Sequence, residues 1–181
     1  MLNAIRIRRH KRYLEEALRR QAYPSQPIGL AQAHVIGLLF DATHLERRRA
    51  ALAFADELQQ MGKLVFKLGY FDSQQSDPNF TFKHFNKSQV DWAYRPQSRD
   101  VDDFTARTFD ILINLEPQTQ PLFEYLAVLC RAKFKVGPRA SRLEIYDLMV
   151  EAAPGEDHAA FVLQVKALLA QTNQHHEESE I

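Results

Sequence analysis

Short apolar runs alternate with amphipathic segments along most of this chain. Residues 35–40, 64–70 and 110–115 are almost continuously apolar, as expected for strands that are buried on both faces of a sheet. Residues 134–137 form a shorter run of the same kind. Apolar residues at helical spacing between these runs predict helices that pack against the sheet. This alternation predicts an α/β fold with a mostly parallel sheet.

Weaker patterns predict the remaining elements. Residues 80–85 alternate in polarity and predict a partly exposed strand, and residues 146–150 predict an edge strand. Residues 101–108 predict a short helix, and residues 157–171 predict a final helix, after which the tail at 172–181 is expected to fray. Four residues of the final helix are predicted to point inward: Phe161, Val165, Leu168 and Leu169.

The helix that follows the first strand has start and stop signals. Thr43 and Glu46 have the spacing of a capping box, in which each side chain satisfies a backbone donor at the helix start. Gly62 is placed to end the helix in the left-handed conformation. A strand, this helix and the next strand together predict a parallel pair with a right-handed crossover.

The N-terminal region differs from the rest of the chain. Residues 3–21 contain no Gly or Pro and predict a helix within an arm at 1–22. Two prolines within 23–31 indicate a linker. The α/β domain is expected at 32–171. The predicted architecture is a single doubly wound, mostly parallel sheet of five or six strands, with helices on both faces and a basic N-terminal helix before it.

Composition excludes several classes of protein. With 45% apolar and 25% charged residues, the chain is neither collagen-like, nor low-complexity, nor a disulfide mini-protein. Its single cysteine, Cys130, excludes an internal disulfide and a multi-cysteine zinc site. No apolar run approaches the ~20 residues of a membrane helix, and no signal-peptide pattern is present. We therefore expect a cytoplasmic protein.

Several short motifs are distinctive: IGLLFDAT (36–43), LGY (68–70), DWAYRP (91–96), VDDF (101–104), FDILINL (109–115), PL (121–122), AKFKVG (132–137) and YDLM (146–149). Together they resemble an uncharacterised, Rossmann-like family that is common in Bacteroidota, over roughly residues 1–170. The resemblance implies the α/β fold and no particular activity. Residues 110–115, the following helix and 134–137 are also similar to one segment of heptosyltransferase-type glycosyltransferases. Those enzymes need a second domain that this chain is too short to supply, so that likeness implies a shared fold only.

The carboxyl ends of the predicted strands form a candidate ligand crevice, because doubly wound sheets bind ligands there. Its residues are Asp41, Thr43, Asn114, Glu116 and Arg139. Asp41 could bind a metal, a ribose hydroxyl or a partner's cation, or it could cap the helix. Arg139 and Arg142 could bind a phosphate or carboxylate. Alternatively, they belong to a solvated basic loop or form ion pairs with Glu144 and Asp147.

Motifs for catalysis and phosphate binding are missing from the sequence. There is no P-loop, no G-x-G-x-x-G and no G-x-S-x-G. Cys130 lies in an apolar segment and is interpreted as a buried core thiol. Asp102 and Asp103 are interpreted as acids at a helix start rather than as an acid/base pair. The histidines show no metal-ligand spacing. The sequence predicts no catalytic residue, no metal and no cofactor.

Charge is distributed unevenly along the chain. The formal net charge is zero, yet residues 1–20 hold seven Lys or Arg and two Glu, which leaves an acidic body. Five of these cations fall within seven positions: Arg6, Arg8, Arg9, Lys11 and Arg12. Such a helix suits a polyanion such as RNA, because phosphate contacts need charge and little sequence information. Alternatively, the helix packs on the acidic body or on another subunit.

A membrane surface is a weaker partner for this arm, since it would favour a broader apolar face with Trp or Phe. Trp92, Tyr94 and Arg95 could form a stacking surface for a base, or they could pack the irregular connection at 86–100 against the sheet.

Two function classes stay open. The favoured class is a non-enzymatic binding or scaffold protein whose basic helix docks on RNA, on a ribonucleoprotein such as the ribosome, or on a protein complex. The other is a small Rossmann-like enzyme, or a domain that binds a nucleotide or sugar nucleotide in the strand-end crevice.

Overall fold

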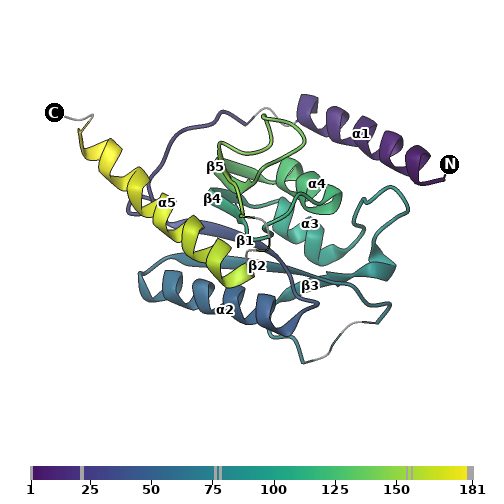
Figure 1. Ribbon diagram of the computed structural model, residues 1–181, viewed down its shortest axis with the longest axis horizontal. Helices are drawn as coiled ribbons and strands as arrows, with labels where there is room; N and C mark the ends of the chain where they lie inside the picture. Colours follow the sequence, from purple (N-terminus) through teal and green to yellow (C-terminus); the bar gives the residue numbers. More distant parts are fainter. Residues whose placement is uncertain are drawn as a thin grey trace.

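Parallel strands form the sheet at the centre of the molecule (Figure 1). The computed structural model describes residues 2–20, 23–75, 77, 79–153, 155 and 157–178. These residues form six strands: β1 (Val35–Asp41), β2 (Leu64–Phe71), β3 (Lys83–Asn86), β4 (Thr108–Asn114), β5 (Arg131–Pro138) and β6 (Leu148–Val150). The strand order is β3-β2-β1-β4-β5-β6, and every neighbouring pair is parallel. This is the order of a doubly wound Rossmann sheet, so the predicted fold class is confirmed.

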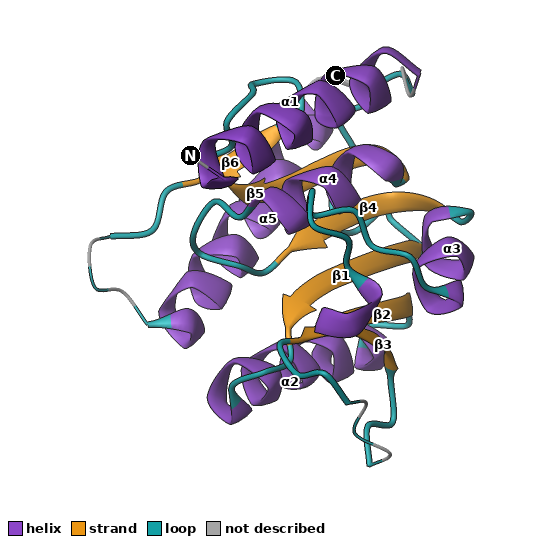
Figure 2. Ribbon diagram, turned by 90° about the vertical axis from the view of Figure 1, so that its right-hand side faces the viewer, coloured by secondary structure: helices purple, strands orange, loops and turns teal. Residues whose placement is uncertain are grey.

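Helices cover both faces of the sheet. One face carries α2 (Leu45–Gln60) and α5 (His158–Glu178), and the other carries α3 (Arg99–Thr105) and α4 (Pro121–Leu129). The N-terminal helix α1 (Leu2–Arg20) lies outside the sheet and packs on α4 (Figure 2). A single 3-10 turn, η1 (Lys87–Gln89), follows β3.

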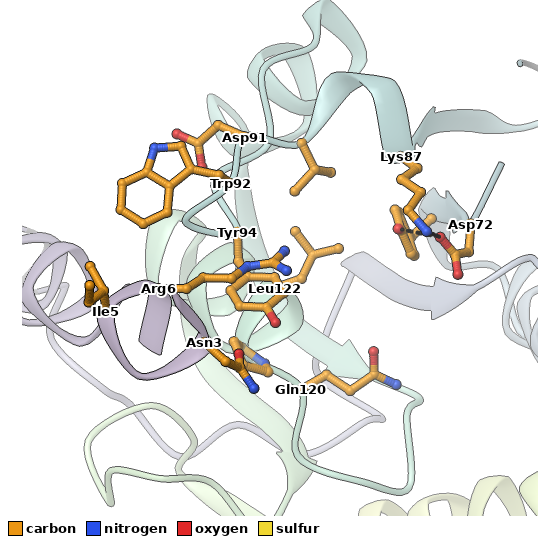
Figure 3. Close-up of a pocket in the computed structure, with 13 residues that line it drawn as sticks. Asn3, Ile5, Arg6, Asp72, Lys87, Asp91, Trp92, Tyr94, Gln120 and Leu122 are labelled. Carbon is orange, nitrogen blue, oxygen red and sulfur yellow. Dashed lines mark hydrogen bonds and ion pairs between the residues drawn. The ribbon is translucent and has the colours of Figure 1, made fainter. Parts of the chain in front are cut away.

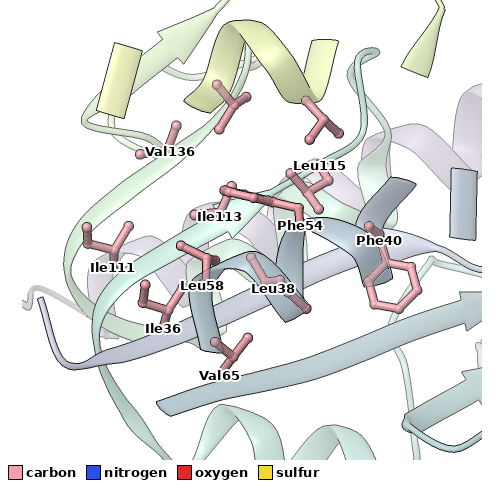
Figure 4. Close-up of a cluster of buried hydrophobic side chains, with 14 of the residues drawn as sticks. Ile36, Leu38, Phe40, Phe54, Leu58, Val65, Ile111, Ile113, Leu115 and Val136 are labelled. Atoms are coloured by element: carbon pink, nitrogen blue, oxygen red, sulfur yellow. The ribbon is translucent and has the colours of Figure 1, made fainter. Parts of the chain in front are cut away.

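The larger apolar cluster fills the space between the sheet, α2 and α5 (Figure 4). Alternate residues of β1, namely Ile36, Leu38 and Phe40, face this cluster, while Leu39 faces the cluster on the other side of the sheet. Because both faces of the strand are buried, its sequence is apolar at nearly every position.

Several element boundaries differ from the predicted ones. The third strand starts at Lys83 rather than at Phe80. The rings of Phe80 and Phe82 stack on each other, with 4.9 Å between their centroids, and Phe80 lies before the paired register. The short helix ends at Thr105 because Thr108 already begins β4. The last helix extends to Glu178, seven residues beyond its predicted end at 171, while residues 179–181 lie outside the described residues. The fraying of the tail stays a prediction.

The start of α2 also differs from the prediction, although its end agrees. Gly62 has φ +79°, so the predicted left-handed stop is confirmed. The predicted capping box of Thr43 and Glu46 is wrong. Helix α2 has His44 at its N-cap, with no side-chain cap, and the Thr43 hydroxyl instead accepts a hydrogen bond from the Asp72 amide (2.9 Å). Within the described part of the chain, no helix has both the length and the apolarity needed to cross a membrane.

Asp110 ties the starts of three strands together. Its carboxylate accepts hydrogen bonds from the backbone amides of His34 (2.8 Å) and Val35 (2.9 Å) and from Nζ of Lys133 (2.7 Å). Burial by itself would raise the pKa of Asp110, but these donors together lower it to about 2. The ionised carboxylate is therefore stabilised by the folded state.

The Asp110 carboxylate should make the protein sensitive to acid. A folded pKa of about 2, against 3.8 for the free side chain, contributes stability that is fully present above pH 3.8 and is lost as the pH falls towards 2. We expect Asp110→Asn to lower the free energy of unfolding by about 2 kcal/mol at pH 7 and by much less near pH 2. Urea unfolding at both pH values measures this. Asp103→Asn, at a more exposed helix carboxylate, is the control. If Asp110→Asn lowers the free energy of unfolding by the same amount at both pH values, this account is wrong.

Candidate functional site

The carboxyl ends of β1 and β4 lie side by side at the point where the chain changes direction across the sheet. Helix α2, which follows β1, covers one face, and α4, which follows β4, covers the other. Ligands of doubly wound sheets bind at such a switch point. The structure brings four of the five predicted crevice residues together here: Asp41, Thr43, Asn114 and Glu116.

Glu116 is the centre of this polar cluster and is fully buried. Its Oε1 accepts a hydrogen bond from the Asp41 amide (2.7 Å), and its Oε2 accepts one from Nη1 of Arg47 (3.1 Å). The side-chain amide of Gln120 donates a longer hydrogen bond from Nε2 to the same Oε2 (3.4 Å). Nε2 of His158, at the start of α5, lies 3.6 Å from Oε1. Both oxygens of the carboxylate are therefore occupied by the protein itself.

The other crevice residues also have internal partners. Asp41 Oδ1 accepts from the Thr43 amide (2.7 Å), which shapes the turn before α2 rather than capping the helix. Asn114 accepts from the Glu116 amide (3.1 Å) and donates to the Tyr146 hydroxyl (2.8 Å). The cluster thus joins β1, β4, α2 and α5 through polar contacts.

Arg139 lies apart from this cluster. Its guanidinium pairs with Glu151 (3.4 Å), and both side chains are largely exposed. Arg142 pairs with Glu15 of α1. The predicted ion-pair partners, Glu144 and Asp147, are therefore wrong for both arginines.

Sequence reasoning missed Arg47 and His158. Arg47 lies on the first turn of a helix that carries three consecutive arginines, and nothing in that run marks one of them as a partner of Glu116. His158 is far from Glu116 in sequence, and only the packing of α5 on the sheet brings the two together. Neither ring nitrogen of His158 has a hydrogen-bond partner among the residues that the structure describes.

Helix α1 is held against the body by a buried face. Leu14 and Ala17 pack into the cluster that contains α4. The His10 ring donates from Nδ1 to the Ala93 carbonyl (3.1 Å) and packs edge-on against Tyr125. Burial lowers the pKa of His10, which favours the neutral imidazole. The sequence left open whether this helix packs on its own domain, and the structure shows that it does.

The five predicted cations of α1 have different environments. The guanidinium of Arg6 lies over the ring of Tyr94, 3.7 Å from the centroid, and Arg9 bonds to the Tyr13 hydroxyl (2.9 Å). Arg8, Lys11 and Arg12 are exposed, and none of them forms an ion pair within the described residues. Within the described part of the chain, two of the five cations, Arg6 and Arg9, are thus held by contacts with other side chains.

A pocket lies between α1 and the carboxyl ends of β2 and β3. It is bordered by Arg6 of α1, Asp72 after β2, the segment 87–94 and the first turn of α4 (Figure 3). Trp92 stands at this pocket and is 57% exposed, so its predicted packing against the sheet is wrong. The alternative prediction, a stacking surface, stays a prediction.

The remaining chemical candidates contribute little to a site. Cys130 is buried, and burial raises the pKa of its thiol to about 12, so the predicted core thiol is confirmed. Among the residues that the structure describes, no three His, Cys, Asp or Glu side chains gather as metal ligands.

Comparisons with known proteins add a family and no activity. No curated protein and no solved structure matches the chain. A family of unknown function, DUF6913, matches residues 7–171. Because this match covers most of the described α1 and the whole sheet, the protein belongs to the DUF6913 family.

Proposed function

We propose that this protein docks on RNA, alone or within a ribonucleoprotein, through the outer face of α1. The observation that carries the proposal is a row of exposed cations without ion-pair partners among the described residues. We call Arg8, Lys11, Arg12 and Arg19 the cationic stripe. At 100° per residue these four positions share one side of the helix, opposite His10, Leu14 and Ala17.

The anchoring of α1 gives this stripe a fixed direction. Because the apolar face is buried against α4, the cations are held outward on a rigid support. From Arg8 to Arg19 the helix rises by about 16 Å, which is long enough to follow several phosphates of one strand. A fixed array of charges binds a polyanion without losing the side-chain and helix freedom that a loose arm would lose.

An RNA partner fits this face better than a membrane. The apolar face of α1 is already occupied by α4, and among the α1 side chains that the structure describes, the large apolar ones left exposed are Ile5 and Ile7. A surface helix that enters a lipid interface needs a free apolar face. A reducing cytoplasm suits this role, since Cys130 is a free buried thiol.

The alternative is a small enzyme or nucleotide-binding domain that uses the switch-point crevice. Glu116, Asn114 and Asp41 would be its polar groups, and each already bonds to the protein itself. A ligand would have to displace those bonds. The binding role through α1 therefore has the stronger support.

Reversing the stripe tests the proposal. We expect Arg8→Glu, Lys11→Glu and Arg12→Glu together to weaken binding of single-stranded RNA by about 100-fold or more near 0.1 M salt, because three phosphate contacts are lost. Fluorescence anisotropy of labelled RNA, measured across a salt series, gives the affinity. The slope of log affinity against log salt should also become shallower by about two units.

The matched control changes the net charge equally at a distance from α1. Arg49→Glu, Arg99→Glu and Arg131→Glu remove three exposed cations on α2, α3 and β5. This variant should bind RNA within a few-fold of wild type. If the two variants lose the same affinity for RNA, net charge alone drives binding. If the stripe variant binds RNA like wild type, the proposal is wrong.

A further inference from the structure

The pocket beside α1 has room for a nucleotide. Its volume is about 1210 Å³, which is larger than the range of about 300–1,000 Å³ that is usual for small-molecule pockets, so one nucleotide would fill only part of it. Four segments that are distant in sequence meet there: the first turns of α1, the end of β2, the segment 87–94 and the first turn of α4 (Figure 3). We propose that this pocket receives one unpaired base of an RNA strand that lies on the cationic stripe, with a phosphate of that nucleotide against Arg6. This inference rests on the proposed function.

Trp92 supplies the stacking surface. It is the only tryptophan of the chain, and more than half of its side chain is exposed at the pocket. Exposed aromatic rings bind unpaired bases of any sequence, because every base has a π-face. Leu122, at the first turn of α4, adds an apolar surface within the same pocket.

Arg6 supplies the cation for the phosphate. Its Nε is buried without a hydrogen-bond partner, and the side chain forms no ion pair among the described residues. The other cation of the pocket, Lys87, is already held by Asp72 (3.1 Å). Helix α4 begins in this pocket, and its N-cap residue Gln120 makes no side-chain cap. The N-terminal end of a helix favours a negative charge.

The segment below Arg6 is fixed in an unusual conformation. Tyr94 has φ +63°, the only positive φ at a non-glycine residue of the described chain. Asp91 holds this turn by accepting from the amides of Ala93 (2.8 Å) and Arg95 (3.0 Å). The Tyr94 ring then lies under the Arg6 guanidinium. Strained residues of this kind persist where the surroundings hold them and are frequent at ligand sites.

The pocket and the stripe are continuous. Ile5 borders both the pocket and the surface that contains Arg8, Arg9, Lys11 and Arg12. A single strand on the stripe can therefore pass over Ile5 and turn one base into the pocket. A duplex cannot do so without breaking a base pair, which distinguishes the two forms of RNA.

Trp92 fluorescence tests the inference, because this residue is the only tryptophan and reports the pocket alone. The full chain is titrated with a short single-stranded RNA and with its duplex, while anisotropy of the labelled RNA reports binding. We expect the single strand to quench the fluorescence of Trp92 and the duplex to bind with little quenching.

Three variants sharpen the test. Trp92→Ala should weaken single-strand binding by about tenfold and leave duplex binding nearly unchanged. Arg6→Gln should reduce the quenching at equal RNA occupancy, whereas Tyr23→Ala, an exposed aromatic outside the pocket, should change neither signal.

The outcomes separate this inference from the proposed function. RNA that binds in anisotropy without quenching Trp92, and with equal affinity for Trp92→Ala, overturns the inference and leaves docking on α1 intact. No anisotropy change with either RNA overturns both. Quenching by a nucleoside monophosphate in the absence of any RNA binding also overturns it, because the pocket then serves a free nucleotide.

Discussion

Glu116→Ala is expected to lower the free energy of unfolding by about 3 kcal/mol. The change removes a fully buried carboxylate, and it leaves the Asp41 amide without its acceptor and Arg47 without its closest partner. Breaking a buried ion pair from one side is strongly destabilising, because the remaining partners are left uncompensated. Arg47 is partly exposed and recovers some hydration, so the expected loss lies at the lower end of the usual range of about 3–5 kcal/mol.

Chemical denaturation with urea measures this loss. Glu116→Gln retains an oxygen that can accept from the Asp41 amide, so about half of the loss is expected. Glu46→Ala, which removes an exposed carboxylate paired with Arg49 on α2, is the control and should change stability by less than about 0.5 kcal/mol. A Glu116→Ala loss no larger than that of the control would show that the cluster does not hold the switch point together. Under the proposed function, Glu116→Gln binds RNA like wild type.

Phe161→Ala is expected to cost about 3–5 kcal/mol of stability. Phe161 is fully buried on α5 and belongs to the cluster shared with α2 and the sheet. Truncating such a ring removes its transfer free energy and leaves a cavity, because the neighbouring side chains relax only partly. The size of this loss measures how strongly α5 contributes to the core.

The same helix provides the control. Leu163 lies two residues further along α5 and is 61% exposed, so Leu163→Ala should change stability by about 0.5 kcal/mol or less. Thermal and urea unfolding of both variants give the comparison. Similar losses for the two variants would contradict the placement of α5, since they would mean that both faces of the helix are equally buried.

Local patterns predicted those parts of the fold that depend on neighbours in sequence. The apolar runs predict β1, β2 and β4 because strands in the middle of a sheet covered by helices have few polar positions. The predicted capping box does not form, because the Thr43 hydroxyl accepts a hydrogen bond from the backbone amide of Asp72, which follows the next strand. Spacing alone contains no information about such a competitor.

The candidate site was predictable only in part. Asp41, Asn114 and Glu116 follow directly from the strand ends of a parallel sheet, and the structure brings them together. The pocket beside α1 could not be predicted, because its walls come from segments that no periodicity connects. The sequence singles out Trp92 and Arg6 separately, and only the packing of α1 on the body brings them to one pocket.

The packing of α1 on the rest of the protein has a consequence for folding during synthesis. Helix α1 precedes every part of the body in the sequence, yet it packs on Ala93, Tyr125 and Arg142. At about 5–20 residues per second, a ribosome needs roughly ten seconds to make the chain between Arg20 and the last of these contacts. During this interval the face with Leu14 and Ala17 has no partner within the chain. Helix α1 therefore leaves the ribosome before the body but reaches its final place only after most of the body is made, and a chaperone or the ribosome surface itself can bind it in the meantime.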